Sequence, residues 1–478
     1  MRRLWHPACS HAAARKVVPT MPFMPVTDSM FLLVETREHP MHVGGLQLFK
    51  KPEDAGPEYM RDIRRKLLDS DNMRDVFRRR PARPVNTAGH VAWATDNDLE
   101  LDYHFRHSAL PQPGRIRELL ELTGRWHSTL LDRHRPLWEI HLVEGLQDGR
   151  FAIYSKIHHA LMDGVSALRH LQGTLSDDPA DLDCPPPWGR RPKPDGGRNG
   201  KASPSVLTTM GKTFNQLAGI APAAMKVARE AFQEHRLTLP AQAPKTMLNV
   251  PIGGARRFAA QSWSLDRVRK VATAAGVSRN DVVLAMCSGA LRDYLMEQNA
   301  LPDAPLTAMV PVSLRRKDSG DAAGNNIGAL LCNLATHLTD PAARLATINA
   351  SMRNGKKLFS ELTPLQTLLL SGINVAQLGV SPIPGIVNNT KPPFNLVISN
   401  VPGPRKQMYW NGASLDGIYP ASVLLDGQAL NITLTSNGDN LDFGVTGCRR
   451  SVPHLQRILT HLDTALAELE HAVSVGRG

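Results

Sequence analysis

Cysteine is scarce in this sequence, and the few cysteines are far apart. Among 478 residues there are five, and no two of them have the spacing of metal ligands. The sequence therefore predicts neither a disulfide framework nor a structural zinc site built on cysteines, and a reducing cytosol suits it best. The five are Cys9, Cys184, Cys287, Cys332 and Cys448.

Long hydrophobic runs are also missing. The most apolar stretch, residues 365–380, is interrupted by polar side chains and is shorter than the roughly 20 residues that cross a bilayer. The sequence predicts no transmembrane span, so any membrane contact is expected to be peripheral. Residues 1–20 contain four basic residues, no acid and no apolar run, which predicts a disordered basic extension. An arginine-rich transit sequence and a start at Met21 are the alternatives.

The phosphate-binding motifs of nucleotide folds, G-x-G-x-x-G and G-x-x-x-x-G-K-[ST], are absent. The formal net charge of +12 indicates an anionic partner, which could be nucleic acid, anionic lipid or a phosphorylated substrate. Aromatic residues make up only 5% of the chain, and no nucleic-acid-binding module is recognisable. Nucleic-acid binding would rest on charge alone, and we do not predict it.

The chain divides into two structured halves and a connection. Residues 21–175 and 251–478 mix strand and helix patterns, whereas residues 176–250 begin with a Pro/Gly-rich linker and continue with a helical pattern over 205–236. Strands and helices follow one another without a regular βαβ cadence, which favours a mixed α/β fold over a Rossmann fold.

Several elements of the second half have clear local signals. Gly276 ends a helix over 264–275, and Ser278 with Asp281 forms a capping-box pattern that starts a helix to about residue 295. A strand is predicted over 394–400, a hairpin from 430–435 and 441–446, and a final amphipathic helix over 453–473.

The most informative segment is residues 151–168. A strand over 151–157 is followed by His158 and His159, then by Asp163, Gly164 and a helix. Neighbouring residues of a strand point to opposite faces, so the two histidines are expected to do different work. A neutral imidazole is a natural general base near pH 7. Asp163 could orient that ring or brace the turn through a salt bridge, and Gly164 would permit a tight turn.

Three interpretations of this segment stay open on the residues alone. The histidines and the aspartate could be purely structural, could bind a metal, or could perform general-base catalysis. Metal binding is the weakest of the three, because the two rings lie on opposite faces and no H-E-x-x-H motif is present.

A family resemblance changes this balance. Residues 158–164 are H-H-x-x-x-D-G, which resembles the signature of the CoA-dependent acyltransferase and condensation-domain superfamily. Four further motifs occur in the right order: P-M-H-V-G-G at 40–45, P-L-W at 136–138, N-D-V-V-L-A at 280–285 and S-N-V-P-G-P at 399–404. Together, over residues 21–473, they resemble the bacterial wax ester synthase/diacylglycerol acyltransferase family.

The resemblance implies a fold and a reaction. The expected fold is α/β, with two chloramphenicol-acetyltransferase-like halves that each contain a mixed sheet with flanking helices and meet at a substrate tunnel. His159 would be the general base that deprotonates the hydroxyl of diacylglycerol or a fatty alcohol for attack on a long-chain acyl-CoA. The products would be triacylglycerol or wax ester, with no covalent acyl-enzyme, no cofactor and no metal. His158 would be supporting, and Asp163 would shape the turn.

The other motif residues have two interpretations each. Asn280 and Asp281 could cap a helix or contact substrate, and Ser399 and Asn400 could end a strand or donate to an oxyanion. Trp138 could be a core residue or a substrate platform.

The basic excess has a use within this resemblance. A cluster of arginines and lysines over residues 61–83 could bind CoA phosphates or anionic lipid, or could simply be a solvated helix face. The resemblance implies a cytoplasmic protein, peripherally attached to the inner membrane face or to lipid droplets, and leaves a homodimer open. A condensation-type transferase with another alcohol or an amine acceptor, and a non-catalytic lipid-binding protein, remain as alternatives.

Overall fold

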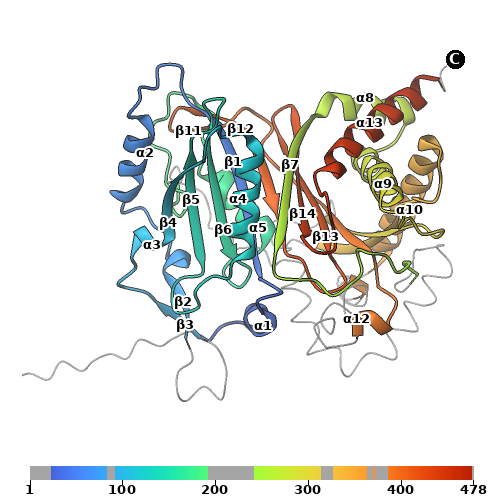
Figure 1. Ribbon diagram of the computed structural model, residues 1–478, viewed down its shortest axis with the longest axis horizontal. Coiled ribbons are helices and arrows are strands. Elements are labelled where there is room, and N and C mark those ends of the chain that lie inside the picture. The colour runs from blue at the N-terminus through green and yellow to red at the C-terminus, as the bar shows by residue number, and fades with distance from the viewer. Residues whose placement is uncertain are drawn as a thin grey trace, which may run out of the picture.

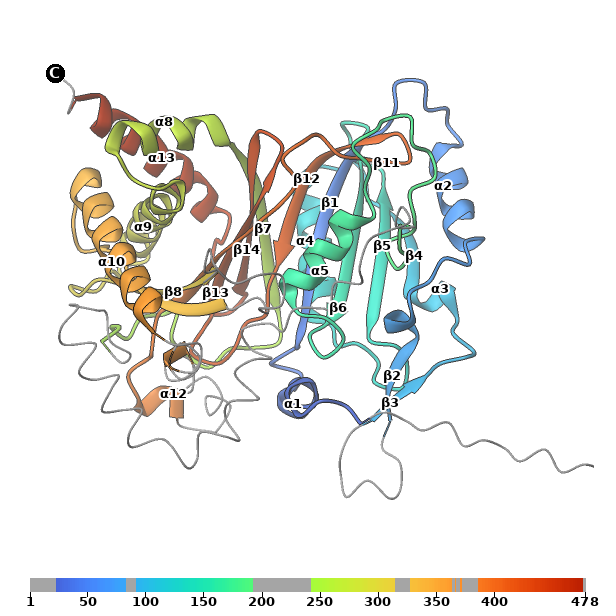
Figure 2. The ribbon, with the colours of Figure 1, turned by 180° about the vertical axis from the view of Figure 1, so that it is seen from behind.

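The computed structural model describes residues 23–82, 92–191, 242–313, 327–362, 366, 370–371 and 386–475. Two six-stranded sheets lie side by side in this part of the chain, with helices packed around them (Figures 1 and 2). The expectation of two mixed sheets with flanking helices is confirmed. The predicted extension over 1–20, the predicted helix over 205–236 and most of the apolar stretch 365–380 lie outside the described residues.

The first sheet is antiparallel except for one parallel pair of strands, β4 and β5. Its central strand β6 is buried over its whole length, as expected for an aromatic and β-branched segment between two neighbours. The strands in spatial order are β11 (Tyr409–Trp410), β12 (Ala413–Ala421), β1 (His42–Lys50), β6 (Phe151–His158), β5 (Trp138–Glu144) and β4 (Phe105–Ala109).

Helices α4 (Ile116–Ser128) and α5 (Gly164–Gly173) cover opposite faces of this sheet. Leu46 and Tyr154 pack with α4, whereas Val43 and Ile157 pack with α5, in keeping with the period of two along a strand. α5 lies close to β1 because residue 45 is a glycine, where a Cβ would come within 2.9 Å of a methyl group of Leu171.

The second sheet has two parallel pairs of strands, formed by β10 with β8 and with β13. The predicted hairpin is confirmed, and its turn is tighter than expected because Gly438, at φ 56°, supports a two-residue connection. The strands in spatial order are β7 (Arg256–Ser264), β14 (Asn440–Cys448), β13 (Leu430–Asn437), β10 (Leu396–Val401), β8 (Thr307–Ser313) and β9 (Ile327–Asn333).

Four helices cover the outer face of the second sheet: α8 (Leu265–Ala275), α9 (Arg279–Glu297), α10 (Pro341–Glu361) and α13 (Arg457–Val475) (Figure 1). α8 ends at Gly276, which is left-handed at φ 65°. α9 starts at the predicted capping box and is buried on nearly all sides, as its apolar sequence requires. α13 begins four residues later than predicted, because residues 453–456 form turns.

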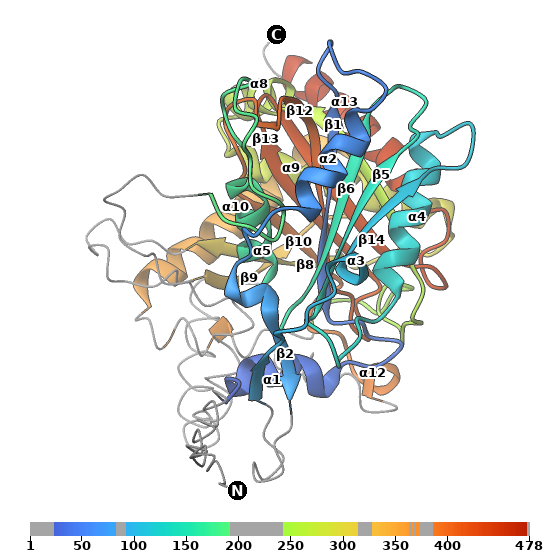
Figure 3. The same cartoon turned by 90° about the vertical axis from the view of Figure 1, so that its left-hand side faces the viewer.

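Smaller elements gather around the first sheet. They are α1 (Val26–Val34), α2 (Tyr59–Leu68), the 3₁₀ helix η1 (Asp75–Arg78), α3 (Leu101–His104) and the hairpin of β2 (Arg79–Ala82) with β3 (Ala92–Thr95). Helix α12 (Ile386–Asn389) precedes β10. Figure 3 shows α1 and the β2–β3 hairpin at the same end of the molecule.

The two predicted halves are interleaved by one segment. β11 and β12 belong to the second half by sequence, yet β12 pairs along its length with β1 of the first sheet. The S-N-V-P-G-P segment begins at the end of β10, and the chain after it leads from the second sheet to β11 in the first. The sequence motif gave no indication of the strand exchange that follows it.

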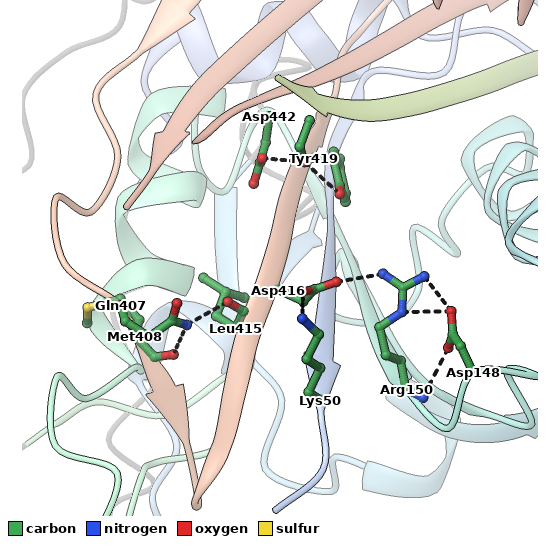
Figure 4. Close-up of polar contacts among 10 residues, drawn as sticks. Lys50, Asp148, Arg150, Gln407, Met408, Leu415, Asp416, Tyr419 and Asp442 are labelled. Atoms are coloured by element: carbon green, nitrogen blue, oxygen red, sulfur yellow. Dashed lines mark hydrogen bonds and ion pairs between the residues drawn. The ribbon is translucent and has the colours of Figure 1, made fainter. Parts of the chain in front are cut away.

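β14 holds this crossing strand at very close range. Asp442 accepts the backbone N–H of Ile418 at 2.8 Å and the hydroxyl of Ser262 at 2.6 Å. Burial raises the pKa of Asp442 to about 6, although these hydrogen bonds act in the opposite direction. Farther along β12, Asp416 pairs with Lys50 and Arg150, each at 2.6 Å (Figure 4).

Gly444 of β14 is the closest point of this crossing. A Cβ at this residue would lie 1.9 Å from the backbone oxygen of Pro420, which cannot move away without breaking β12. We therefore expect Gly444→Ala to lower the free energy of unfolding by roughly 3 kcal/mol, as overpacking does. Chemical denaturation measures this loss. The control is Gly173→Ala, because a Cβ there meets nothing within 4 Å. An unchanged Gly444→Ala protein would show that the crossing is looser than described.

Candidate active site

His158 is the last residue of β6, and its side chain faces the α4 side of the first sheet, together with His42 and Tyr154. It has no exposed surface. Its Nδ1 accepts the backbone N–H of Ala160 at 3.0 Å, so the ring proton lies on Nε2. That nitrogen is 3.3 Å from Oε1 of Glu35. His158 is therefore fixed in both orientation and tautomer.

Glu35, immediately after α1, is the partner that sequence analysis missed. Its buried carboxylate accepts the N–H of Met41 at 3.0 Å and also pairs with Arg133 at 3.0 Å. Burial would raise the pKa of Glu35, but the contacts with His158, Met41 and Arg133 outweigh it and hold the pKa below its ordinary value. No periodic pattern links residue 35 to residue 158, so no signal in the sequence could have found this pair.

His159 lies just beyond the last residue of β6, so the alternation of side chains along a strand does not fix its direction. Its backbone N–H donates to the carbonyl of Met41 at 2.8 Å. Its ring stacks on Phe31 of α1, with centroids 4.4 Å apart and the planes 17° from parallel. Burial lowers the pKa of His159 to about 4, and the neighbouring His158 lowers it further while Asp163 acts against them. The imidazole is therefore neutral at pH 7 and free to accept a proton.

Asp163 caps helix α5 rather than forming a salt bridge. Its carboxylate accepts the N–H of Ser166 at 2.9 Å and the Ser166 hydroxyl at 2.8 Å. This contact braces the turn after the histidines, as the structural interpretation of Asp163 required. The aspartate acts on His159 only through its charge, which favours the protonated ring.

We expected Gly164 to permit a tight turn, but the backbone of Gly164 is not in a conformation that requires glycine. Gly164 is the first residue of α5, and it is not among the glycines with positive φ. A Cβ there would lie 3.5 Å from Val43, which is ordinary van der Waals contact. The described backbone at this position would therefore accept an alanine.

A buried polar layer lies behind the histidine pair. His42, which pairs with His158 in the sheet, donates through Nε2 to the carbonyl of His127 at 2.9 Å. His127 donates to the carbonyl of Ser422 at 3.1 Å and accepts the Tyr154 hydroxyl at 2.8 Å. Burial lowers the pKa of His127 to about 3, which keeps it neutral. This layer ties α4, β1 and β6 to the end of β12.

The structure brings the second group of candidates together at the start of α9. Asn400 Nδ2 lies 3.5 Å from Asn280 Oδ1, which joins the end of β10 to the helix. Asp281 is 3% exposed, shares a capping box with Ser278 and accepts Asn349 at 2.9 Å. Asp281 is thus a capping residue rather than a substrate contact.

Ser399 lies on the other face of β10, away from the helices. It is in register with Thr433, whose hydroxyl is 2.8 Å from that of Ser422 at the end of β12. Ser399 therefore faces the junction of the two sheets, on the side where β12 also meets His127. Within the described residues no hydrogen bond joins Ser399 or Asn400 to the histidine pair.

Trp138 takes the first of the two interpretations that the sequence left open. Its side chain has no exposed surface, its indole N–H donates to the carbonyl of Phe77 at 2.8 Å, and it stacks on His104 at 4.5 Å. These contacts occupy the ring and make Trp138 a core residue instead of a substrate platform.

The basic cluster over residues 61–83 also divides in the structure. The four basic residues of α2 have acidic partners, in the pairs Arg61–Glu58, Arg64–Asp102, Arg65–Asp62 and Lys66–Asp183, as expected for a solvated helix face. Arg79 and Arg80 of β2 form no ion pair with any residue that the structure describes. In the same described ranges, no three His, Cys, Asp or Glu side chains are placed to hold a metal ion.

Two mixed sheets joined by a crossing strand, with H-H-x-x-x-D-G at the end of β6, agree with the fold that the family resemblance implied. The chain matches the family model of the wax ester synthase/diacylglycerol acyltransferase catalytic domain over residues 24–283 and that of the WS/DGAT C-terminal domain over residues 323–470. It therefore belongs to the wax ester synthase/diacylglycerol acyltransferase family, and it is an acyltransferase, as the resemblance implied.

Similar proteins agree over nearly the whole length. A probable diacylglycerol O-acyltransferase of Mycobacterium tuberculosis is 57% identical over 95% of this chain and 100% of its own. The O-acyltransferase WSD of Acinetobacter baylyi is 43% identical over 95% of this chain and 98% of its own. The solved wax ester synthase/diacylglycerol acyltransferase from Marinobacter aquaeolei VT8 has a TM-score of 0.76 at 40% identity, covering 95% and 100% of the two chains.

More distant structures share the fold. The first condensation domain of the CDA synthetase has a TM-score of 0.56 at 16% identity, covering 95% of this chain and 96% of that one.

Glu35 offers a direct test of how the histidine pair is held. Glu35→Gln keeps an oxygen for the Met41 N–H but removes the negative charge that faces His158 and Arg133. We expect kcat/KM to fall by about 10- to 100-fold with little change in KM, because the reacting groups are displaced and not removed. Steady-state kinetics of acyl transfer measures this effect. Glu38→Gln, at an exposed position three residues away, is the control and should match the wild type. An equal loss in both variants would refute a positioning role for Glu35.

Proposed function

We propose that this protein transfers a long-chain acyl group from acyl-CoA to diacylglycerol or a fatty alcohol, giving triacylglycerol or wax ester, with His159 as the general base. The observation that carries the proposal is the state of His159: a neutral imidazole on the end of a rigid strand, beside a second histidine held by a buried carboxylate. The names of the similar proteins support the choice of substrates.

In this mechanism His159 accepts the proton of the acceptor hydroxyl as its oxygen attacks the thioester carbonyl. The new C–O bond gives a tetrahedral oxyanion, and its collapse breaks the C–S bond. The departing CoA sulfur takes the proton back from the imidazolium, so that the base is regenerated. Acyl-CoA is a substrate in this scheme, and no cofactor takes part.

The described cysteines are poorly suited to form an acyl-enzyme. Cys184, Cys287, Cys332 and Cys448 are all buried. Burial raises the pKa of Cys287 and of Cys332 to about 12, so almost no thiolate is present at pH 7. Burial also acts to raise the pKa of Cys448, but hydrogen bonds from Gly253 and Ser451 lower it overall, so for Cys448 the argument is its burial alone. This supports direct transfer from CoA to the acceptor.

The supporting residues have separate roles in the proposal. His158 fixes the strand end, and Asp163 fixes the start of α5. Ser399 faces the sheet junction and is the candidate donor to the oxyanion, while Asn280 and Asn400 together form a polar wall at the start of α9. In the described part of the chain, no helix has both the length and the hydropathy to span a bilayer. We propose a cytoplasmic protein that meets its acceptor at a membrane or lipid-droplet surface.

The decisive experiment measures CoA release from palmitoyl-CoA with hexadecanol, with dioleoylglycerol and with no acceptor. We expect acceptor-dependent release by the wild type and a loss of at least about 100-fold in His159→Ala, which removes the base. His134→Ala is the control, since that ring is 97% exposed and lies outside the site. If neither hexadecanol nor dioleoylglycerol increases CoA release above the rate without acceptor, the substrate assignment is overturned. Full activity in His159→Ala would overturn the general-base mechanism.

The pH dependence gives an independent check of the base. Because the pKa of His159 is lowered to about 4, the ring stays neutral throughout the range from pH 8 to pH 6. We expect kcat/KM to be flat over that range and to fall only as the pH approaches 4, where protonation removes the base. Circular dichroism at each pH shows whether the protein is still folded. A half-maximal loss near pH 6.5 would instead indicate an ordinary, solvated histidine.

A further inference from the structure

Helix α1 has an unusual outer face. Its inner side is anchored: Leu32 is 5% exposed, Phe31 stacks on His159, and the buried Glu35 follows the helix directly. On its outer side Met30 is 43% exposed and Leu33 is 61% exposed, three residues apart and hence on one face. A helix on the surface of a soluble protein normally carries polar residues there.

The sequence of α1, VTDSMFLLV, contains one charged residue, Asp28. The helix as a whole is therefore apolar, and the exposed apolar side chains are not isolated exceptions in a polar sequence. Elsewhere in the described chain, exposed apolar residues such as Leu182 and Met296 occur singly on separate segments, which is ordinary.

The hairpin of β2 and β3, at the same end of the molecule as α1, carries basic residues. Residue 23, just before α1, bridges to Ala92 of β3, and β3 pairs with β2. β2 begins with Arg79 and Arg80, which have no ion-pair partner among the described residues. Figures 1 and 2 show α1 and this hairpin together at one end of both sheets. Exposed apolar residues beside unpaired arginines form the pattern of a protein that rests on anionic lipid.

We propose that the outer face of α1, defined by Met30 and Leu33, and Arg79 of β2 dock the protein on a lipid surface that contains anionic phospholipid. Arg79 is the exposed one of the two arginines, whereas Arg80 is half-buried and points to the opposite face of the strand. The apolar side chains enter the acyl boundary and Arg79 meets the phosphates. Because the inner side of the same helix covers the His159 ring, docking places the general base directly below the lipid surface. An apolar acceptor can then reach it from the lipid. This last step rests on the proposed function, whereas the docking does not.

Vesicle flotation tests the docking face. The probes are vesicles of phosphatidylcholine alone and of equal parts phosphatidylcholine and phosphatidylglycerol. We expect the wild type to bind the anionic vesicles and Met30→Ser/Leu33→Ser to bind them at least tenfold more weakly. Arg79→Gln should lose about fivefold, and only on the anionic vesicles. Leu182→Ser/Met296→Ser, which removes two exposed apolar side chains elsewhere, is the control and should bind like the wild type.

Two further measurements separate the outcomes. Met30→Ser/Leu33→Ser should keep the wild-type thermal midpoint and the wild-type rate with a short acyl-CoA and a soluble short-chain alcohol, while its rate with acceptor in vesicles falls. Undiminished vesicle binding by this variant, or no binding by the wild type, overturns the proposal. A change from dimer to monomer in sedimentation, with vesicle binding unaltered, would assign the face to a second copy of the chain. If vesicle binding behaves as expected but no acceptor is acylated, the docking stands and the proposed function fails.

Discussion

The antiparallel pairing of β12 with β1 is the contact on which the arrangement of the two sheets depends. β12 comes from the second half of the chain and pairs with β1 in the first sheet. Side chains of β14 in the second sheet accept hydrogen bonds from the backbone of Ile418 and Ser422, so β12 is bonded to both sheets. β1 in turn carries His42 opposite His158. The end of β6, where the histidine pair lies, is thus placed beside the second sheet through two neighbouring strand pairings. Any loosening of the crossing would separate the histidine pair from Ser399 at the junction of the two sheets.

The two histidines show how burial and charge divide a single motif into two tasks. His158 is buried next to a carboxylate, and the resulting contacts fix its ring. His159 is desolvated by Phe31 and has no hydrogen bond to Asp163, so burial lowers its pKa and leaves it neutral. Helix α1 serves both, since it carries Phe31 and leads into Glu35. A buried carboxylate is stable only when its partners satisfy it, which Arg133 and the Met41 N–H do here.

Helix α1 also lies between His159 and the surface of the protein. Its inner side sets the environment of His159, and its outer side presents apolar residues on the side of the molecule where β2 begins with Arg79. In the proposed mechanism His159, with a pKa near 4, is a weak base, and it gains from a water-poor site in which the acceptor hydroxyl has no competing solvent. Resting on lipid would keep water away on the outer side of the helix as well as bring the acceptor.

The sequence by itself determined the features whose causes are local. The capping box of Ser278 and Asp281, the end of α8 at Gly276 and the hairpin around Gly438 all follow from residues within a few positions of one another. The motifs also identified the family. Tertiary structure alone decided the exchange of β12, the pairing of Glu35 with His158, the burial of Trp138 and the freedom of Gly164 from strain. Each of these depends on which distant segment packs against the residue, and the periodicity of one segment carries no information about its partner 100 residues away.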